Sequence, residues 1–354
     1  MSKYVVKGLP WNGSIGTDVS DCKTAREVME KAHLDFFVDK CGLVAKMPFT
    51  TNGDNTVNKL MGDFAYDGNV YRPCPDAFAT YRTDKNIPLG IVKDKYTVVQ
   101  NTEAFNFFDD AIGNNQAEWV SAGCFGYGHL IYLVAKLPQT IKVGNVDIVD
   151  NYLVFSNSHD GTMSVNILFT PVRVFCFNCL SSARRRADSY IRLKHTTSVT
   201  SRLELGSSVI QASLQYCNNI SELYTAMYNT KLTDEEVTKY ISSLILSKNE
   251  FSDVLDSDYN TGLKKLLNKD YMTMERTGIS TRKVNQINTI LDYYFTAENQ
   301  QNVIGTAWGA YNAITGYFAN VKDDIDIKRM YGTLYGGDSL KMQSAFEEAI
   351  ELIQ

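Results

Sequence analysis

The sequence predicts an α+β protein: an antiparallel β-meander core with a basic helix after it, followed by a largely helical C-terminal half. Three observations favour this fold class. Between residues 79 and 173 short apolar blocks are separated by glycine turns. After Arg173 the apolar residues recur at helical spacings of three, four and seven. Strands precede helices instead of alternating with them, which is typical of α+β organisation.

The domain boundaries expected from this pattern are 1–78 for a loop-rich N-terminal accessory segment, 79–200 for the sheet core with its basic helix, and 201–354 for the helical region. The chain has 354 residues, of which 44% are hydrophobic and 21% charged, and this composition excludes a disordered chain. No apolar run reaches the roughly 18 residues of a membrane span, so no membrane partner is expected. The first eleven residues lack a secretory pattern, and seven scattered cysteines suit reduced thiols. We therefore expect a cytoplasmic protein.

The accessory segment contains one clear helix signal. Thr24 and Glu27 form a possible capping box before an expected helix over 25–34. The stretch 46–75 is rich in glycine turns and proline, which predicts irregular backbone.

Five strands and one helix are expected in the core. Asp160-Gly161 is typical of a hairpin turn between the last two strands, because both residue types tolerate positive φ. Short connections favour antiparallel pairing. The expected strands are 96–99, 118–124, 129–137, 151–157 and 163–173, and the expected helix is 102–112.

The C-terminal half shows repeated helix starts. Ser201 with Glu204, and Thr233 with Glu236, have capping-box spacing. Apolar periodicity then predicts helices over 202–229, 237–244, 282–296, 303–319 and 340–353. Small residues beside Trp308 and Tyr311 indicate close helix packing there.

The strongest functional signal is a basic segment between Pro171 and Arg202. It holds seven Lys and Arg residues against a single acid, in a chain whose net charge is −5. Such a patch suits phosphate binding, and Tyr190 could stack on a base. The alternative is a solvated helix face, since successive residues at 184–186 point 100° apart. The candidate nucleic-acid-binding residues are Arg173, Arg184, Arg185, Arg186, Tyr190, Arg192, Lys194, His195 and Arg202.

Signals for catalysis, metals or cofactors are weak, and none of the three is predicted. Cys176 and Cys179 have C-x-x-C spacing but lack a second ligand pair, so two core thiols are expected. His159, Asp160 and His195 lack metal-ligand spacing. The glycines at 123, 126 and 128 lie between two strands rather than before a helix, and no P-loop motif occurs.

Several sequence blocks together resemble a known family. They include Tyr96–Asn101, Ser156–Gly161, Thr170–Val174 with Cys176 and Asn178, Arg192 with Lys194–Thr196, and Gly305–Ala313. The chain resembles the phage/plasmid-like protein family, a domain of unknown function found in phages, plasmids and bacterial genomes. This resemblance implies a mobile-element setting, but it supplies no catalytic residues. The order of elements is also similar to that of single-strand annealing proteins, which is an analogy of fold alone.

Three functions remain open at this point. The first is nucleic-acid binding, with single-stranded DNA favoured, in recombination or replication. The second is a counter-defence or regulatory protein that binds a host protein or a small nucleotide without catalysis. The third is a metal-dependent nuclease using His159, Asp160 and His195. A homo-oligomer is expected in each case, because 21 tyrosines and 17 phenylalanines can supply an interface as well as a core.

Overall fold

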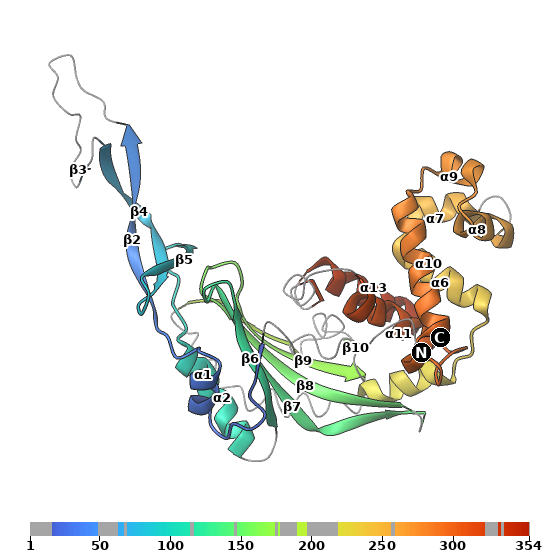
Figure 1. Ribbon diagram of the computed structural model, residues 1–354, viewed down its shortest axis with the longest axis horizontal. Coiled ribbons are helices and arrows are strands. Elements are labelled where there is room, and N and C mark those ends of the chain that lie inside the picture. Colours follow the sequence, from blue (N-terminus) through green and yellow to red (C-terminus); the bar gives the residue numbers. More distant parts are fainter. Residues whose placement is uncertain are drawn as a thin grey trace.

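The computed structural model describes residues 16–48, 63–66, 69–113, 117–144, 147–173, 176–177, 190–196, 219–255, 259–322, 332–333 and 336–353. Three parts are visible in Figure 1: a projecting β-ribbon, a curved sheet, and a helical body at the opposite end of that sheet. The expected fold class is confirmed, since antiparallel sheets in the N-terminal half precede a mostly helical C-terminal half.

The main sheet has seven strands among the described residues. Its order is β1-β6-β7-β8-β9-β10, with β11 also beside β9, and every neighbouring pair is antiparallel. The bounds are β1 Gly16–Asp18, β6 Glu118–Phe125, β7 Leu130–Val143, β8 Asp147–Ser158, β9 Val165–Arg173, β10 Cys176–Phe177 and β11 Tyr190–Leu193. The strands expected at 118–124, 129–137, 151–157 and 163–173 are therefore confirmed, and β7 and β8 run longer than expected.

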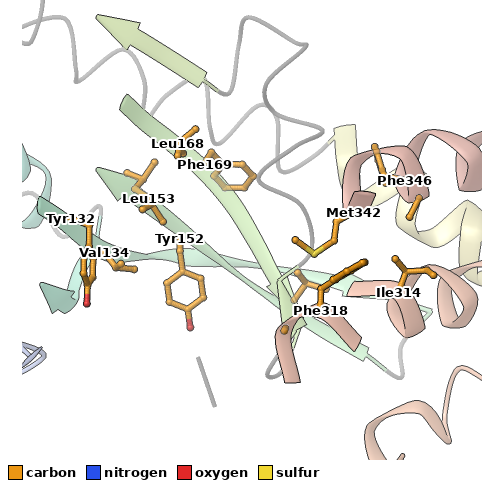
Figure 2. Close-up of a cluster of buried hydrophobic side chains, with 14 of the residues drawn as sticks. Tyr132, Val134, Tyr152, Leu153, Leu168, Phe169, Ile314, Phe318, Met342 and Phe346 are labelled. Atoms are coloured by element: carbon orange, nitrogen blue, oxygen red, sulfur yellow. The ribbon is translucent and has the colours of Figure 1, made fainter. Parts of the chain in front are cut away.

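Both faces of this sheet are buried. Tyr152 and Leu153 are adjacent in β8 and lie on opposite faces, and both are buried (Figure 2). A run of apolar residues without polar alternation suits a strand covered on both sides. The sheet therefore forms the centre of the hydrophobic core.

The helical body packs beside one end of the sheet. Its helices are α6 Asp234–Ile245, α7 Lys248–Leu255, α8 Tyr259–Leu267, α9 Tyr271–Thr277, α10 Thr281–Thr296, α11 Ala307–Gly316 and α13 Gly337–Glu351, with the short turns η1 Glu298–Gln300 and η2 Tyr317–Val321. The predicted capping box of Thr233 and Glu236 is confirmed at α6. Figure 2 shows the apolar side chains of Ile314, Phe318, Met342 and Phe346 gathered in this part of the core. None of the described helices has the length and apolar character that a membrane span needs.

Packing around Trp308 confirms the close approach expected there. Its ring is fully buried and lies 4.4 Å from that of Tyr224. The indole Nε1 donates to Asp147 Oδ2 at 2.8 Å, which ties α11 to the start of β8.

The projecting ribbon corrects the expectation of irregular backbone over 46–75 where that range is described. Residues 49–62, 67 and 68 lie outside the described residues. The ribbon contains β2 Val38–Pro48, β3 Phe64–Tyr66, β4 Asn69–Arg82 and β5 Ile87–Val92, in the order β2-β4-β3 with β5 also beside β4. Pro73 and Pro75 lie within β4 itself. In this narrow sheet few side chains are buried, so the apolar alternation that marks a strand is weak. Both prolines lie between the parts of β4 that pair with β3 and with β5, where one side of the strand has no partner among the described strands. Proline is tolerated at such an edge, and this explains why the prediction was wrong for the described residues.

Two short helices lie between the ribbon and the main sheet in the chain. They are α1 Ala25–Lys31, which begins at the predicted Thr24 cap, and α2 Asn101–Gly113. The strand expected at 96–99 is absent, because this extended segment has other partners. Thr97 N donates to His195 O, and the Tyr96 carbonyl accepts from Lys40 Nζ.

Candidate basic pocket

A cavity of about 440 Å³ lies where the ribbon meets the main sheet. Three chain segments form its wall: the end of β5 with the residues after it, the turn between β8 and β9, and the end of β11. The lining residues are Ile91, Val92, Lys93, Lys95, Tyr96, Gly161, Thr162, Met163, Ser164, Arg192, Lys194, His195 and Thr196. Its volume lies in the range of small-molecule sites, about 300–1,000 Å³.

Close backbone contacts hold the ribbon against the turn after β8. Thr80 Oγ1 donates to the His159 carbonyl at 2.6 Å. Gly90 packs so tightly that an added Cβ would lie 2.5 Å from Asp160 Cα. Gly161 has φ +78°, a conformation that glycine adopts without strain, as the Asp160-Gly161 pair predicted. One wall of the pocket is thereby fixed to the other.

Strand β11 supplies the third wall. Its register pairs Arg192 with Asn166 and Leu193 with Val165. Arg192 Nε donates to Ser164 Oγ at 3.1 Å, which places this guanidinium beside the residue that directly precedes β9. Lys194 and His195 follow directly, and both line the cavity.

The wall carries four cations, Lys93, Lys95, Arg192 and Lys194, and all four side chains are exposed. None of the described lining residues is acidic. Within the described part of the chain, no ion pair joins these four cations to a carboxylate.

Two carboxylates lie next to the wall, and one further lysine offsets them. Asp160 Oδ1 accepts from Ser158 Oγ and from the Thr162 backbone and hydroxyl. Asp94 stands between the two lysines, and its carbonyl accepts from Lys40 Nζ. The surroundings of the pocket thus remain net positive.

His195 contributes a neutral surface. Its ring stacks on Tyr96 with centroids 4.4 Å apart, and Nδ1 lies 3.0 Å from the Thr97 carbonyl oxygen. Burial lowers the pKa of His195, and the carbonyls of Thr97 and Met163 oppose this effect only in part. Burial raises the pKa of Tyr96, whose hydroxyl donates to the Ser158 carbonyl. At neutral pH the positive charge therefore comes from the lysines and the arginine.

His159 is part of the core beneath this pocket. Its Nε2 lies 2.9 Å from Asn101 Oδ1, and the residue is fully buried. Burial lowers its pKa to about 3, with a smaller contribution from nearby His195. Within the described ranges, His, Cys, Asp and Glu side chains form no group of three or more that could hold a metal ion. His159, Asp160 and His195 are thus neighbours that bond to different partners.

The structure brings together three of the residues predicted from the sequence: Arg192, Lys194 and His195. Arg173 ends β9 and Tyr190 begins β11, but the described structure does not extend to their side chains. Arg184, Arg185, Arg186, Arg202 and Cys179 lie outside the described residues. Cys176 lies in β10.

Sequence reasoning missed Lys93 and Lys95, which precede β11 by about a hundred positions. Two lysines around one aspartate are an ordinary surface pattern. The signal that could have found them is their position just before Tyr96, the residue that begins one of the blocks that carry the family resemblance.

Comparison with known proteins gives one match. Neither the curated proteins nor the solved structures contain a match to this chain. A family model described as a domain of unknown function, DUF932, matches residues 88–334. That range includes every residue lining the basic pocket and excludes strands β1 to β4. Because the match spans more than half of the sequence, the chain belongs to the DUF932 family.

Proposed function

We propose that this protein binds nucleic acid and that the basic pocket holds its phosphate backbone. The observation that carries the proposal is the convergence of Lys93, Lys95, Arg192 and Lys194 on one cavity without a lining acid. Lysine and arginine gain affinity for nucleic acid by displacing condensed counterions from phosphates. The Ser164 hydroxyl in the same wall accepts from Arg192, and its own proton is suited to a hydrogen bond with a phosphate oxygen.

We propose single-stranded DNA as the favoured form, bound during recombination or replication of a phage or plasmid. The family resemblance supports the mobile-element setting, and the order of elements supports the comparison with annealing proteins. Annealing would require a homo-oligomer that repeats the basic pocket along a strand.

The size of the cavity favours a second candidate function. A pocket of about 440 Å³ suits a small phosphorylated ligand, such as a nucleotide bound in a regulatory or counter-defence role. Competition separates the two functions. A mononucleotide that binds more tightly than an oligonucleotide would favour the regulatory role.

The test is fluorescence-anisotropy binding of labelled single- and double-stranded oligonucleotides over a salt series. The key variant changes all four lining cations to glutamine: Lys93→Gln, Lys95→Gln, Arg192→Gln and Lys194→Gln. Each cation that no longer neutralises a phosphate should make the log–log salt slope shallower by about 0.7 for a single strand. The matched control makes the same charge change at exposed lysines elsewhere: Lys23→Gln, Lys46→Gln, Lys142→Gln and Lys265→Gln.

Unchanged affinity and salt slope in the pocket variant would contradict the proposal. A third variant, Arg184→Gln with Arg185→Gln and Arg186→Gln, tests the neighbouring arginine segment separately. Loss of binding only in that variant would move the interface away from the pocket.

A further inference from the structure

The basic pocket also has an apolar part that phosphate binding does not use. Ile91 is 70% exposed although its neighbours in β5, Leu89 and Val92, contribute to the core. Met163 is half-buried and lines the same cavity from the turn before β9. A large apolar side chain exposed inside a cationic cavity indicates a ligand with both an anionic and an apolar surface.

The two segments that carry these apolar residues pack on each other. An added Cβ on Gly161 would lie 2.9 Å from Val92 Cγ1 and 3.6 Å from the Ile91 carbonyl oxygen. The turn that carries Met163 therefore packs directly on the strand that carries Ile91. This contact places Ile91 and Met163 on adjoining segments of the pocket wall, beside Lys93 and Lys95.

We infer that the pocket seats one unpaired nucleobase against Ile91 and Met163 while the flanking cations hold the adjoining phosphates. The inference rests on the proposed function and names its substrate class: a single strand whose bases are accessible. Nucleobases stack on apolar as well as aromatic side chains when they leave a helix. A paired base would first have to be unstacked from the duplex, at a cost of a few kilocalories per mole, so duplex should bind more weakly.

The stacked pair of Tyr96 and His195 forms another part of the same wall. Its rings are nearly parallel, with 20° between their planes. Both groups are neutral at neutral pH. Tyr96 is half-buried and His195 is buried, so the accessible part of this uncharged pair is mostly Tyr96. A base seated here would meet apolar and π surfaces, and its phosphates would meet the cations.

The experiment compares two single strands of equal length and charge. One is oligothymidylate, and the other carries abasic tetrahydrofuran units in place of the nucleotides. Both are titrated by fluorescence anisotropy over the same salt series and compared at equal salt concentration. The expected result is that the abasic strand binds about tenfold more weakly, as removal of one stacking contact predicts.

Two variants locate the base. Ile91→Ser should remove most of the difference between the two strands while leaving the salt slope unchanged. Ile148→Ser is the matched control, since Ile148 is also exposed, at 51%, but lies at the opposite end of β8 from the turn. That control should keep the full difference. Because both isoleucines are exposed, neither substitution opens a core cavity.

The outcomes separate the two proposals. Equal and tight binding of both strands overturns the base seat and leaves phosphate binding intact. A difference that persists in Ile91→Ser also overturns the seat, because the base then binds elsewhere. Absence of binding to either strand at low salt overturns the proposed function itself.

Discussion

Gly90 is the position where a single methyl group should separate the ribbon from the main sheet. Its added Cβ would lie 2.5 Å from Asp160 Cα and 2.7 Å from the Asp160 carbonyl carbon. Carbon atoms normally approach to about 3.5–4.0 Å, so Gly90→Ala requires a shift of roughly 1 Å. The obstacle is backbone, which cannot rotate away as a side chain can.

The expected cost follows from overpacking. Inserting a methyl group into a filled site destabilises a protein by about 1–3 kcal/mol. Reduced freedom of the unfolded chain offsets about 0.4–1 kcal/mol of this amount. For a chain of 354 residues the entropy of unfolding is about 0.7 kcal/mol/K, so each net 1 kcal/mol lowers Tm by about 1–2 °C. We therefore expect Gly90→Ala to lower Tm by about 1–3 °C, and to weaken oligonucleotide binding because the pocket walls separate.

Gly42 supplies the control for this substitution. It lies in β2 of the same ribbon, and an added Cβ there would have no atom within 4 Å. Gly42→Ala should leave Tm and oligonucleotide affinity close to those of the parent protein. Thermal unfolding followed by circular dichroism, with anisotropy binding in parallel, measures both effects. Equal Tm values for the two variants would refute the packing argument.

The remaining predictions concern pH and helix capping. The folded pKa of His159 is about 3, below the unfolded value of 6.5, so the unfolded chain binds the extra proton between these values. The free energy of unfolding should fall as pH drops through this window, by up to about 1.4 kcal/mol per pH unit. His159→Gln should reduce the difference between the free energies of urea unfolding measured at pH 5 and at pH 7. Thr233→Ala removes the capping box of α6 and should cost about 1 kcal/mol in urea unfolding. Thr289→Ala, a half-buried position within α10, is its control, and equal destabilisation by both would count against the cap.

Local sequence signals predicted those elements whose stability is itself local. The Thr233 and Glu236 side chains and the Asp160-Gly161 turn act within a few residues, so their spacing is visible in the sequence. The prediction of a strand at 96–99 was wrong for the opposite reason. The apolar, β-branched residues of this segment suit a strand, but Lys40 and His195 bind its backbone from distant parts of the chain.

The pocket shows the same limit at the level of function. Charge counting found Arg192 and Lys194 because they belong to one basic segment. Lys93 and Lys95 stand in a stretch of ordinary charge, and only the pairing of β11 with β9 and the packing of β5 on the Asp160 turn bring them to the same cavity.

Burial explains why the histidine of the pocket is a poor candidate for acid–base chemistry in the free protein. Burial lowers the pKa of His195. A bound phosphate would reverse part of this effect, since an anion near the ring favours the imidazolium. Oligonucleotide affinity should therefore rise as pH falls below neutrality, and His195→Gln should remove that rise. Equal pH dependence in the variant would place the titrating group elsewhere.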